Sequence, residues 1–237
     1  MRKLNSDFLQ KLDDAFHIYL TAGARSNEKL KPIHSFISDA LKECLKDKSL
    51  SFHSLRADAH GGERVINGRY MEKQVDIAVC RGDKPIAAIG FKFVMSNYKQ
   101  NSNNYFENML GETANIRCAK IPYFQIFVLL EDLPYYKNSG EIGRFEHVNE
   151  HNLGKYIVIS KDNPDVYFHT PVKTLLYIVK LPKNKDLGDK TTYRNFYKDR
   201  SLSLPESEKF KDKFDSGIVL NDFETFITKV AYHIKSI

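Results

Sequence analysis

Two residues of opposite charge, Asp76 and Lys92, stand within stretches of sequence that are otherwise apolar. Asp76 lies in residues 75–79, which read VDIAV, and Lys92 lies in residues 89–94, which read IGFKFV. Because an unpaired charge is unfavourable in an apolar strand, each of these groups is expected to have a partner. The pair predicts a charged site shared by two adjacent strands. The alternative interpretation is a structural ion pair, or two residues on a solvated face.

An acid and a lysine in this arrangement suit the hydrolysis of a phosphodiester bond. A divalent cation polarises the phosphate and lowers the pKa of its bound water, and a hard cation such as Mg²⁺ prefers two or more carboxylate oxygens. A lysine beside the cation can orient or deprotonate the attacking water and offset the phosphate charge. The expected pattern is an acid on one strand and an acid-x-lysine on the next, brought together by a hairpin.

The surrounding sequence predicts the elements that would hold this site. Residues 73–94 form two apolar runs around Arg81-Gly82-Asp83-Lys84, a composition typical of a hairpin turn. The near-continuous apolar run at 123–130 is typical of a strand covered on both faces. Residues 95–104 are predicted to be a polar loop. Apolar periodicity and capping residues predict helices at 6–20, 30–47, 103–118 and 221–234, a short buried helix starting at Pro171, and a strand at 155–160. This order predicts an α/β fold with a mixed central β-sheet flanked by helices.

The composition indicates a single globular domain with an excess of positive charge. The 237 residues suit one domain, residues 1–237, with its core at about 30–180. A basic tract and a C-terminal helix, residues 181–237, are expected to pack on that core. The net charge of +6 and the pI of about 9.0 favour a polyanionic partner. Three cysteines without a CxxC spacing indicate free thiols in a cytoplasmic setting, and the absence of a long apolar stretch predicts no membrane span.

The spacing around Asp76 and Lys92 resembles that of a known superfamily. Val75-Asp76, then thirteen residues, then Gly90-Phe91-Lys92 is similar to the motif of the PD-(D/E)xK restriction-endonuclease-like proteins. The resemblance covers roughly residues 30–130. It implies a restriction-endonuclease-like fold, a Mg²⁺ cofactor and double-stranded DNA as the substrate. The sequence departs from the motif at Gly90, which stands where the second acid of the family belongs.

Some type II enzymes of this superfamily carry the second acid on the helix that follows the motif. Glu107 and Glu112 are the candidates here, fifteen and twenty residues after Lys92. On a helical wheel they stand about 140° apart, so one of them, and hardly both, is expected at a single metal. The spacing favours Glu107. The resemblance then implies that Asp76 and Glu107 hold Mg²⁺ and that Lys92 acts on the attacking water.

Two further acids are weaker candidates for the metal site. Glu43 lies at the edge of the apolar stripe of the second predicted helix, where the superfamily often supplies a glutamate. Glu72 precedes Asp76 by four residues and shares its strand face by the period of two. The alternative interpretation is surface ion pairing for Glu43 and Glu72, and a solvated helix carboxylate for Glu107 and Glu112.

Candidate DNA contacts come from polar residues on either side of the hairpin. Asn and Gln side chains can bond to adenine edges, and Lys or Arg to guanine. Arg56, Arg64 and Arg69 are candidates for phosphate contacts, and the basic and aromatic tract at 180–200 suits a clamp on the DNA backbone. The alternatives are a polar surface loop and a solvated linker. The candidates for base contacts are Asn97, Lys99, Gln100, Asn101, Asn103 and Asn104.

These features together predict a type II restriction endonuclease that hydrolyses double-stranded DNA at a specific sequence. Cleavage of both strands at a palindrome requires two sites related by a two-fold axis, so a homodimer is expected. The resemblance also implies a cognate DNA methyltransferase in the same system. Two alternatives stay open: a catalytically inactive DNA-binding protein of the same fold, and a repair or junction-resolving nuclease.

Overall fold

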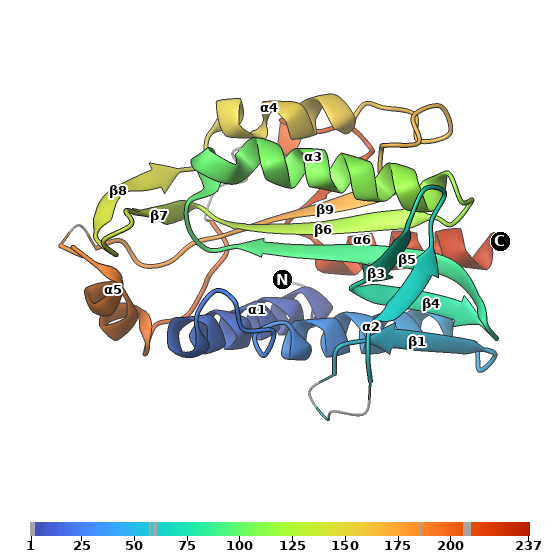
Figure 1. The fold of residues 1–237 in the computed structure, drawn as a ribbon, viewed down its shortest axis with the longest axis horizontal. Helices are drawn as coiled ribbons and strands as arrows, with labels where there is room; N and C mark the ends of the chain where they lie inside the picture. The colour runs from blue at the N-terminus through green and yellow to red at the C-terminus, as the bar shows by residue number, and fades with distance from the viewer. Residues whose placement is uncertain (1–2, 57, 59–60, 185, 206–209) are drawn as a thin grey trace.

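A mixed β-sheet forms the centre of the computed structural model, which describes residues 3–56, 58, 61–184, 186–205 and 210–237 (Figure 1). Within these residues the sheet has six strands in the order β1-β4-β5-β6-β9-β10. Neighbours from β1 to β5 are antiparallel, and neighbours from β5 to β10 are parallel. The fold is therefore α/β with a mixed central sheet, as the sequence predicts. The strands are β1 (Leu50–Ser54), β4 (Ile77–Arg81), β5 (Lys84–Val94), β6 (Tyr123–Leu130), β9 (Lys173–Val179) and β10 (Ile218–Leu220).

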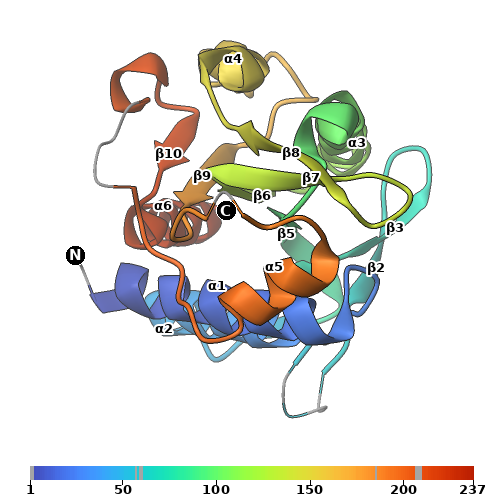
Figure 2. The ribbon, with the colours of Figure 1, turned by 90° about the vertical axis from the view of Figure 1, so that its left-hand side faces the viewer.

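Helices cover both faces of this sheet. On one face lie α1 (Lys3–Ala22), α2 (Lys31–Leu45) and α6 (Phe223–Lys235), and on the other lie α3 (Tyr98–Arg117) and α4 (Glu150–Ile159) (Figure 1). The helix α5 (Lys190–Tyr197) packs against α1 (Figure 2). One continuous cluster of buried side chains includes Phe8 of α1 and Ile234 of α6, so both terminal segments share a core with the sheet.

Two small antiparallel ribbons flank the main sheet. The first pairs β2 (Arg64–Asn67) with β3 (Glu72–Val75), and the second pairs β7 (Asp132–Tyr136) with β8 (Ile142–His147). The chain leaves β3 at Val75, passes through Asp76 and enters β4 at Ile77. Asp76 therefore stands at the junction between a ribbon and the central sheet.

The predicted hairpin and the predicted buried strand are confirmed. β4 and β5 pair antiparallel, with Arg81 opposite Lys84, and Gly82 in the turn has a φ of +59° that favours glycine. β6 spans Tyr123–Leu130 with every residue buried, because it lies between β5 and β9 and has helices on both faces. The hairpin differs from the prediction at its start, where Asp76 interrupts the first strand.

Two sequence predictions are wrong because helix and strand are exchanged. Residues 155–160, predicted as a strand, belong to α4, which starts with a capping box between Asn149 and Asn152 and buries Leu153, Tyr156 and Ile159 on one face. The segment from Pro171, predicted as a helix, forms β9, a strand paired on both sides. Short apolar runs fit a buried helix and a buried strand equally well, so pairing with neighbouring strands decides between them.

Several boundaries also differ from the predictions. α3 begins at Tyr98, so most of the predicted loop at 95–104 is helical. α6 is capped by Asp222, whose side chain accepts from the Thr225 amide, and not by Asn221.

Within the described part of the chain, no helix combines the length and hydropathy needed to span a bilayer. Cys44, Cys80 and Cys118 are free thiols.

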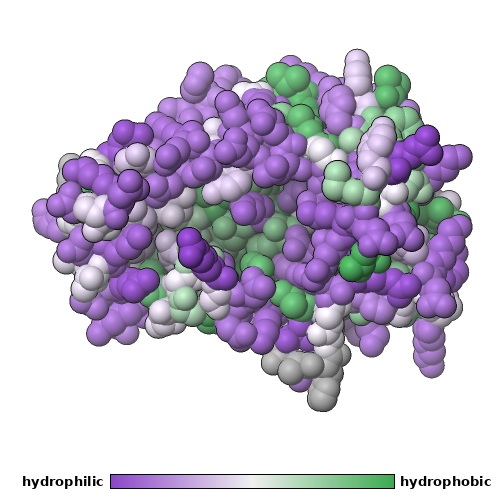
Figure 3. All heavy atoms as spheres, viewed as in Figure 1, coloured by the Kyte–Doolittle hydropathy of each residue, from purple (hydrophilic) through white to green (hydrophobic). Residues whose placement is uncertain are grey.

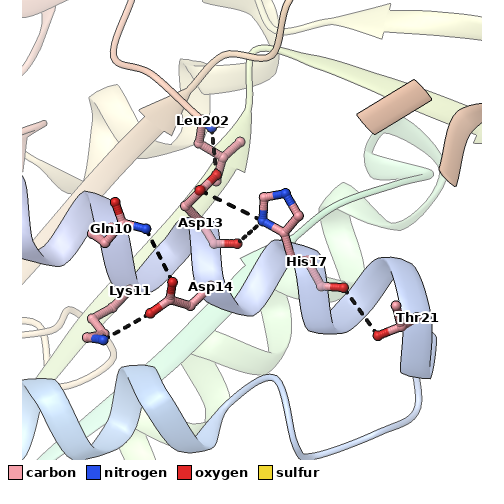
Figure 4. Close-up of polar contacts among 7 residues, drawn as sticks. All are labelled: Gln10, Lys11, Asp13, Asp14, His17, Thr21 and Leu202. Carbon is pink, nitrogen blue, oxygen red and sulfur yellow. Dashed lines mark hydrogen bonds and ion pairs between the residues drawn. The ribbon is translucent and has the colours of Figure 1, made fainter. Parts of the chain in front are cut away.

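A buried carboxylate in α1 holds the chain that follows α5. Asp13 is 6% exposed, and its Oδ1 accepts a hydrogen bond of 2.7 Å from the Leu202 amide (Figure 4). His17 lies one helical turn away, with its Nδ1 3.8 Å from Asp13 Oδ2. The neighbouring Asp14 points instead to Lys11, at 2.9 Å, on the half-exposed side of the helix. Asp13 therefore links the C-terminal region to the first helix.

We expect Asp13→Ala to lower the free energy of unfolding by about 1–3 kcal/mol, because it leaves the buried Leu202 amide without an acceptor. Asp14→Ala on the same helix is the matched control and should change stability by less than about 0.5 kcal/mol. Urea unfolding of both variants measures the difference. Equal effects would show that the Asp13 contact does not hold the C-terminal region.

Candidate active site

A cleft of about 620 Å³ opens between α3 and the strands β5 and β6. Figure 3 shows this face of the molecule hollowed between α3 and the helices α1 and α2. A second cavity of about 380 Å³ continues from it toward the end of α1, and Asp76 and Lys92 line both. The two residues predicted from the sequence thus border one continuous depression. The acids of α3 that line the larger cleft are Glu107 and Glu112.

The carboxylate of Asp76 is held by a backbone group of the neighbouring strand. The Phe91 amide donates to Asp76 Oδ2 at 2.7 Å. The pKa of Asp76 is raised to about 7, mainly by burial and also by the charges of Glu112 and Glu63, whereas the Phe91 hydrogen bond and the charge of Lys73 lower it. Among the described residues no ion pair joins Asp76 to Lys92, so the alternative interpretation of a structural ion pair between them is wrong. The carboxylate of Asp76 takes a neutral donor, and the charge of Lys73 stabilises it only slightly.

The space above Gly90 explains why no acid stands at that position. A Cβ atom built on Gly90 would lie 1.9 Å from the hydroxyl oxygen of Tyr123 and 2.9 Å from Oε1 of Gln125. The Tyr123 hydroxyl donates to Glu112 Oε1 at 3.0 Å. A side chain at position 90 is therefore excluded by a tyrosine that directs its proton to an acid of α3. The carboxylate of Glu112 therefore lies one hydrogen bond away from the hydroxyl that fills the space above Gly90.

Glu107 and Glu112 occupy different parts of the cleft. Glu112 is half-buried, forms an ion pair of 2.9 Å with Lys73 of β3, and raises the pKa of Asp76 through its charge. Glu107 is exposed, and its charge acts on Lys155 of α4. The structure thus brings Glu112 into electrostatic contact with Asp76 and leaves Glu107 farther out on the lining of the same cleft.

Lys92 projects into the cleft from near the C-terminal end of β5. Its ammonium lies 4.8 Å from the centre of the Tyr105 ring, and the side chain is exposed. Lys29, which lines the second cavity, has a pKa lowered by burial and by the charge of Lys92. Two ammonium groups therefore face the same space. Their combined positive charge, opposite the carboxylates of the cleft, suits a phosphate that is bound between them.

Two residues not selected from the sequence also lie beside Asp76. One ligand atom from each of His34, Glu63 and Asp76 falls within 4.8 Å of the others. His34 of α2 is fully buried, and neither of its ring nitrogens has a hydrogen-bond partner in the described structure. Burial lowers the pKa of His34 to about 4, so the ring is neutral at pH 7 and keeps a free lone pair. The one signal in the sequence is a histidine between the apolar residues of a helix.

The weaker metal candidates lie elsewhere. Glu43 is exposed at the far end of α2, where its charge acts on Cys44. It follows His34 by nine residues, or about 13 Å along the helix. Glu72 is exposed on β3 opposite Asn67. Neither residue lines the two cavities that contain Asp76.

The residues predicted to contact DNA fall into two groups: some bond to other parts of the protein, and others are exposed. Asn97 precedes α3 and exchanges two hydrogen bonds with the backbone of Tyr136, so its amide fastens β7 to the helix. Asn101 donates to the Asn97 carbonyl, and Asn103 accepts from Lys155. The Arg64 guanidinium donates to the Asp83 carbonyl across the hairpin. The exposed members of the set are Arg69, Lys99, Gln100, Asn103 and Asn104.

The basic tract at 180–200 is more deeply packed than a solvated clamp. Tyr193 and Tyr197 of α5 are buried, and the Tyr197 ring packs edge-on against Phe16 of α1. The aromatic residues of this tract therefore belong in part to the core, whereas Lys190 and Arg194 stay exposed.

Comparison of the chain with protein-family models, with curated proteins and with solved structures finds no match. The function is therefore inferred from the chemistry of the cleft.

The raised pKa of Asp76 predicts how the stability of the folded protein changes with pH. Between about pH 4 and pH 7 the folded protein holds a proton that the unfolded chain has lost, so stability falls as the pH rises through this range. Asp76→Asn keeps the acceptor for the Phe91 amide and removes the charge. At pH 8 without divalent ions we expect the variant to be more stable than the parent by about 2–4 kcal/mol, and at pH 4 to be equal to it.

Urea unfolding at the two pH values measures this difference. Asp83→Asn, in the exposed hairpin turn, is the control and should show no such pH dependence. A destabilised Asp76→Asn at pH 8 would mean that the charge of Asp76 supports the fold.

Proposed function

We propose that this chain is a metal-dependent endonuclease that hydrolyses phosphodiester bonds of double-stranded DNA, with a restriction-endonuclease-like site. The observation that carries the proposal is the half-buried carboxylate of Asp76, held by a backbone amide beside two other acids, with Lys92 in the same cleft. A protein stabilises such a concentration of negative charge only poorly by itself. A divalent cation is the natural partner for it.

The residues of the cleft fit such a cation. Asp76 and Glu112 offer carboxylate oxygens, and Glu63 and His34 offer further ligand atoms beside Asp76. The ion pair of Glu112 with Lys73 is partly exposed, so it contributes about 1 kcal/mol or less and is readily exchanged for a metal. When bound, Mg²⁺ would draw charge from the phosphate and lower the pKa of a water molecule.

Each side chain of the proposed site then has a distinct role in the reaction. Asp76 and Glu112 would hold the cation, which would fix the position of the scissile phosphate. Lys92 Nζ donates to a phosphate oxygen and offsets the charge that develops as water attacks. The water displaces the 3′ oxygen in line and leaves a 5′-phosphate end. We therefore assign the displaced second acid to Glu112, in place of Glu107.

The wider proposal is a type II restriction endonuclease. Two copies of this cleft on a two-fold axis would cut both strands of a palindromic sequence, so the active form is a homodimer. The excess of basic residues supports a DNA substrate. A cognate DNA methyltransferase would protect the host sequence.

The two acids of α3 allow a matched test of the site. We expect Asp76→Ala and Glu112→Gln to reduce the rate of Mg²⁺-dependent plasmid cleavage by about a hundredfold or more, because each removes a carboxylate from the site. Glu107→Gln, on the same helix, should stay within about threefold of the parent.

The products are mapped by end sequencing after digestion of varied DNA. Discrete fragments with 5′-phosphate ends agree with a restriction enzyme, whereas nicking that depends on DNA structure indicates a repair or junction-resolving enzyme. A loss of cleavage in Glu107→Gln but not in Glu112→Gln would show that Glu107, and not Glu112, is the second acid of the site.

His34 offers a test of the metal site that does not depend on cleavage. An imidazole nitrogen favours Mn²⁺ over Mg²⁺. We expect His34→Leu to weaken Mn²⁺ binding about tenfold while it changes Mg²⁺ binding little. Because the buried ring nitrogens have no partners, the substitution should not lower the thermal stability of the metal-free protein.

Calorimetric titration of each metal into the parent, His34→Leu and Asp76→Asn measures these affinities. A catalytically inactive DNA-binding protein would show no binding that depends on the carboxylates. Equal Mn²⁺ affinities for the parent and His34→Leu would show that His34 is not a metal ligand.

A further inference from the structure

A separate cavity of about 370 Å³ lies between the end of α1, the β7 strand and α5, on the side of the molecule that faces the viewer in Figure 2. Its described lining contains no aspartate or glutamate. A cavity enclosed by cations and hydroxyl groups in this way selects for an anion. The charged and phenolic residues that line it are Tyr19, Tyr136, Lys137, Lys190, Tyr193 and Arg194.

The Tyr193 hydroxyl is a donor without an acceptor. Tyr193 is 1% exposed, and its hydroxyl oxygen is buried with no hydrogen-bond partner in the described structure. Burial raises the pKa of Tyr193, and the neighbouring Tyr136 raises it further, so the group keeps its proton at neutral pH. Burying an unsatisfied hydroxyl is unfavourable. A ligand oxygen in the cavity would supply the missing acceptor.

The positive charge of the cavity is only partly neutralised by its surroundings, where the charge of Asp189 also reaches Tyr136. Lys137 pairs with Glu141 at 3.2 Å, but within the described residues no ion pair involves Lys190 or Arg194. The Lys190 ammonium lies 5.1 Å from the centre of the Tyr136 ring. The charge of Arg194 lowers the pKa of Tyr19, which burial raises. Two cations are thus available to an incoming anion.

The cavity is continuous with the proposed cleavage site. Tyr19, Ala24 and Ser96 line both this cavity and the one that contains Asp76 and Lys92. Ser96 follows Lys92 by four residues along β5 and its exit, which corresponds to about 13 Å of extended chain. That length equals the rise of about four base pairs along the axis of duplex DNA, at about 3.4 Å for each phosphate of one strand.

We propose that this cavity binds a backbone phosphate of the DNA strand that leaves the cleavage site toward α5. Arg194 and Lys190 bind the phosphate oxygens, and Tyr193 donates its hydroxyl hydrogen to one of them. The proposal rests on the proposed nuclease function for the identity of the anion. The chemistry itself is that of a phosphate group, which a small phosphorylated ligand would share.

The test uses three substitutions in α5 and its cap. Arg194→Gln should reduce the slope of log K against log salt concentration by about 0.9 and weaken DNA binding about fivefold. Tyr193→Phe removes an uncharged donor, so it should weaken binding about threefold without a change of slope. Lys198→Gln, an exposed cation at the end of the same helix, is the control and should change neither quantity.

Fluorescence anisotropy of a labelled duplex, in EDTA so that the DNA stays intact, measures affinity and slope. In parallel, inorganic phosphate is compared with chloride at equal ionic strength. It should raise the Tm of the parent and not that of Arg194→Gln. An unchanged slope in Arg194→Gln overturns the proposal, as does unchanged DNA affinity in Tyr193→Phe.

The outcomes also separate this proposal from the nuclease function. In one outcome phosphate raises the Tm only when Arg194 is present, and Arg194→Gln leaves the salt dependence of DNA binding unchanged. The cavity would then bind a small phosphorylated ligand, and the proposal that it binds the DNA strand would be overturned. A reduced slope in Arg194→Gln, combined with a parent protein that cleaves no DNA with any divalent ion, would uphold the phosphate site and refute the nuclease.

Discussion

The hydrogen bond from the Phe91 amide to the Asp76 carboxylate fixes a negative charge at the junction of β3 and β4. A neutral donor holds the group in place without neutralising it, and burial accounts for most of its raised pKa. The other members of the site are arranged around this charge. β5 supplies Lys92, α3 supplies Glu112 and α2 supplies His34. The cleft is therefore organised about one carboxylate that the fold alone stabilises poorly.

The close approach of Tyr123 to Gly90 determines where a second acid can stand. The tyrosine hydroxyl occupies the volume of a side chain at position 90, so only glycine fits there. The same hydroxyl donates to Glu112, and this contact orients that carboxylate over the strand. One side chain thus excludes an acid from β5 and positions another acid from α3.

The terminal segments build the wall of the second cavity. α1 and α5 meet through buried aromatic contacts, and Asp13 holds the chain after α5 against α1. Tyr193 belongs both to this packing and to the cavity lining. The basic tract therefore packs on the core through its tyrosines, as the sequence predicts, and is not a solvated linker. Its lysine and arginine side chains extend the positive surface of the cleft along the exit of β5.

The sequence by itself determined the central hairpin and the buried strand β6, and it singled out Asp76 and Lys92, which line the same cleft, because turn residues, apolar runs and charges within apolar runs are local signals. The same local signals predicted a strand in place of α4 and a helix in place of β9, because a short apolar run fits either element until its neighbours are known. Local spacing also favoured Glu107, which is exposed and is not among the charges that shift the pKa of Asp76. Only the tertiary structure showed that the charge of Glu112 acts on Asp76 and that His34 and Glu63 lie beside it. Which side chains meet across β5, α2 and α3 depends on strand register, helix docking and burial, and these are set by contacts between residues far apart in the chain.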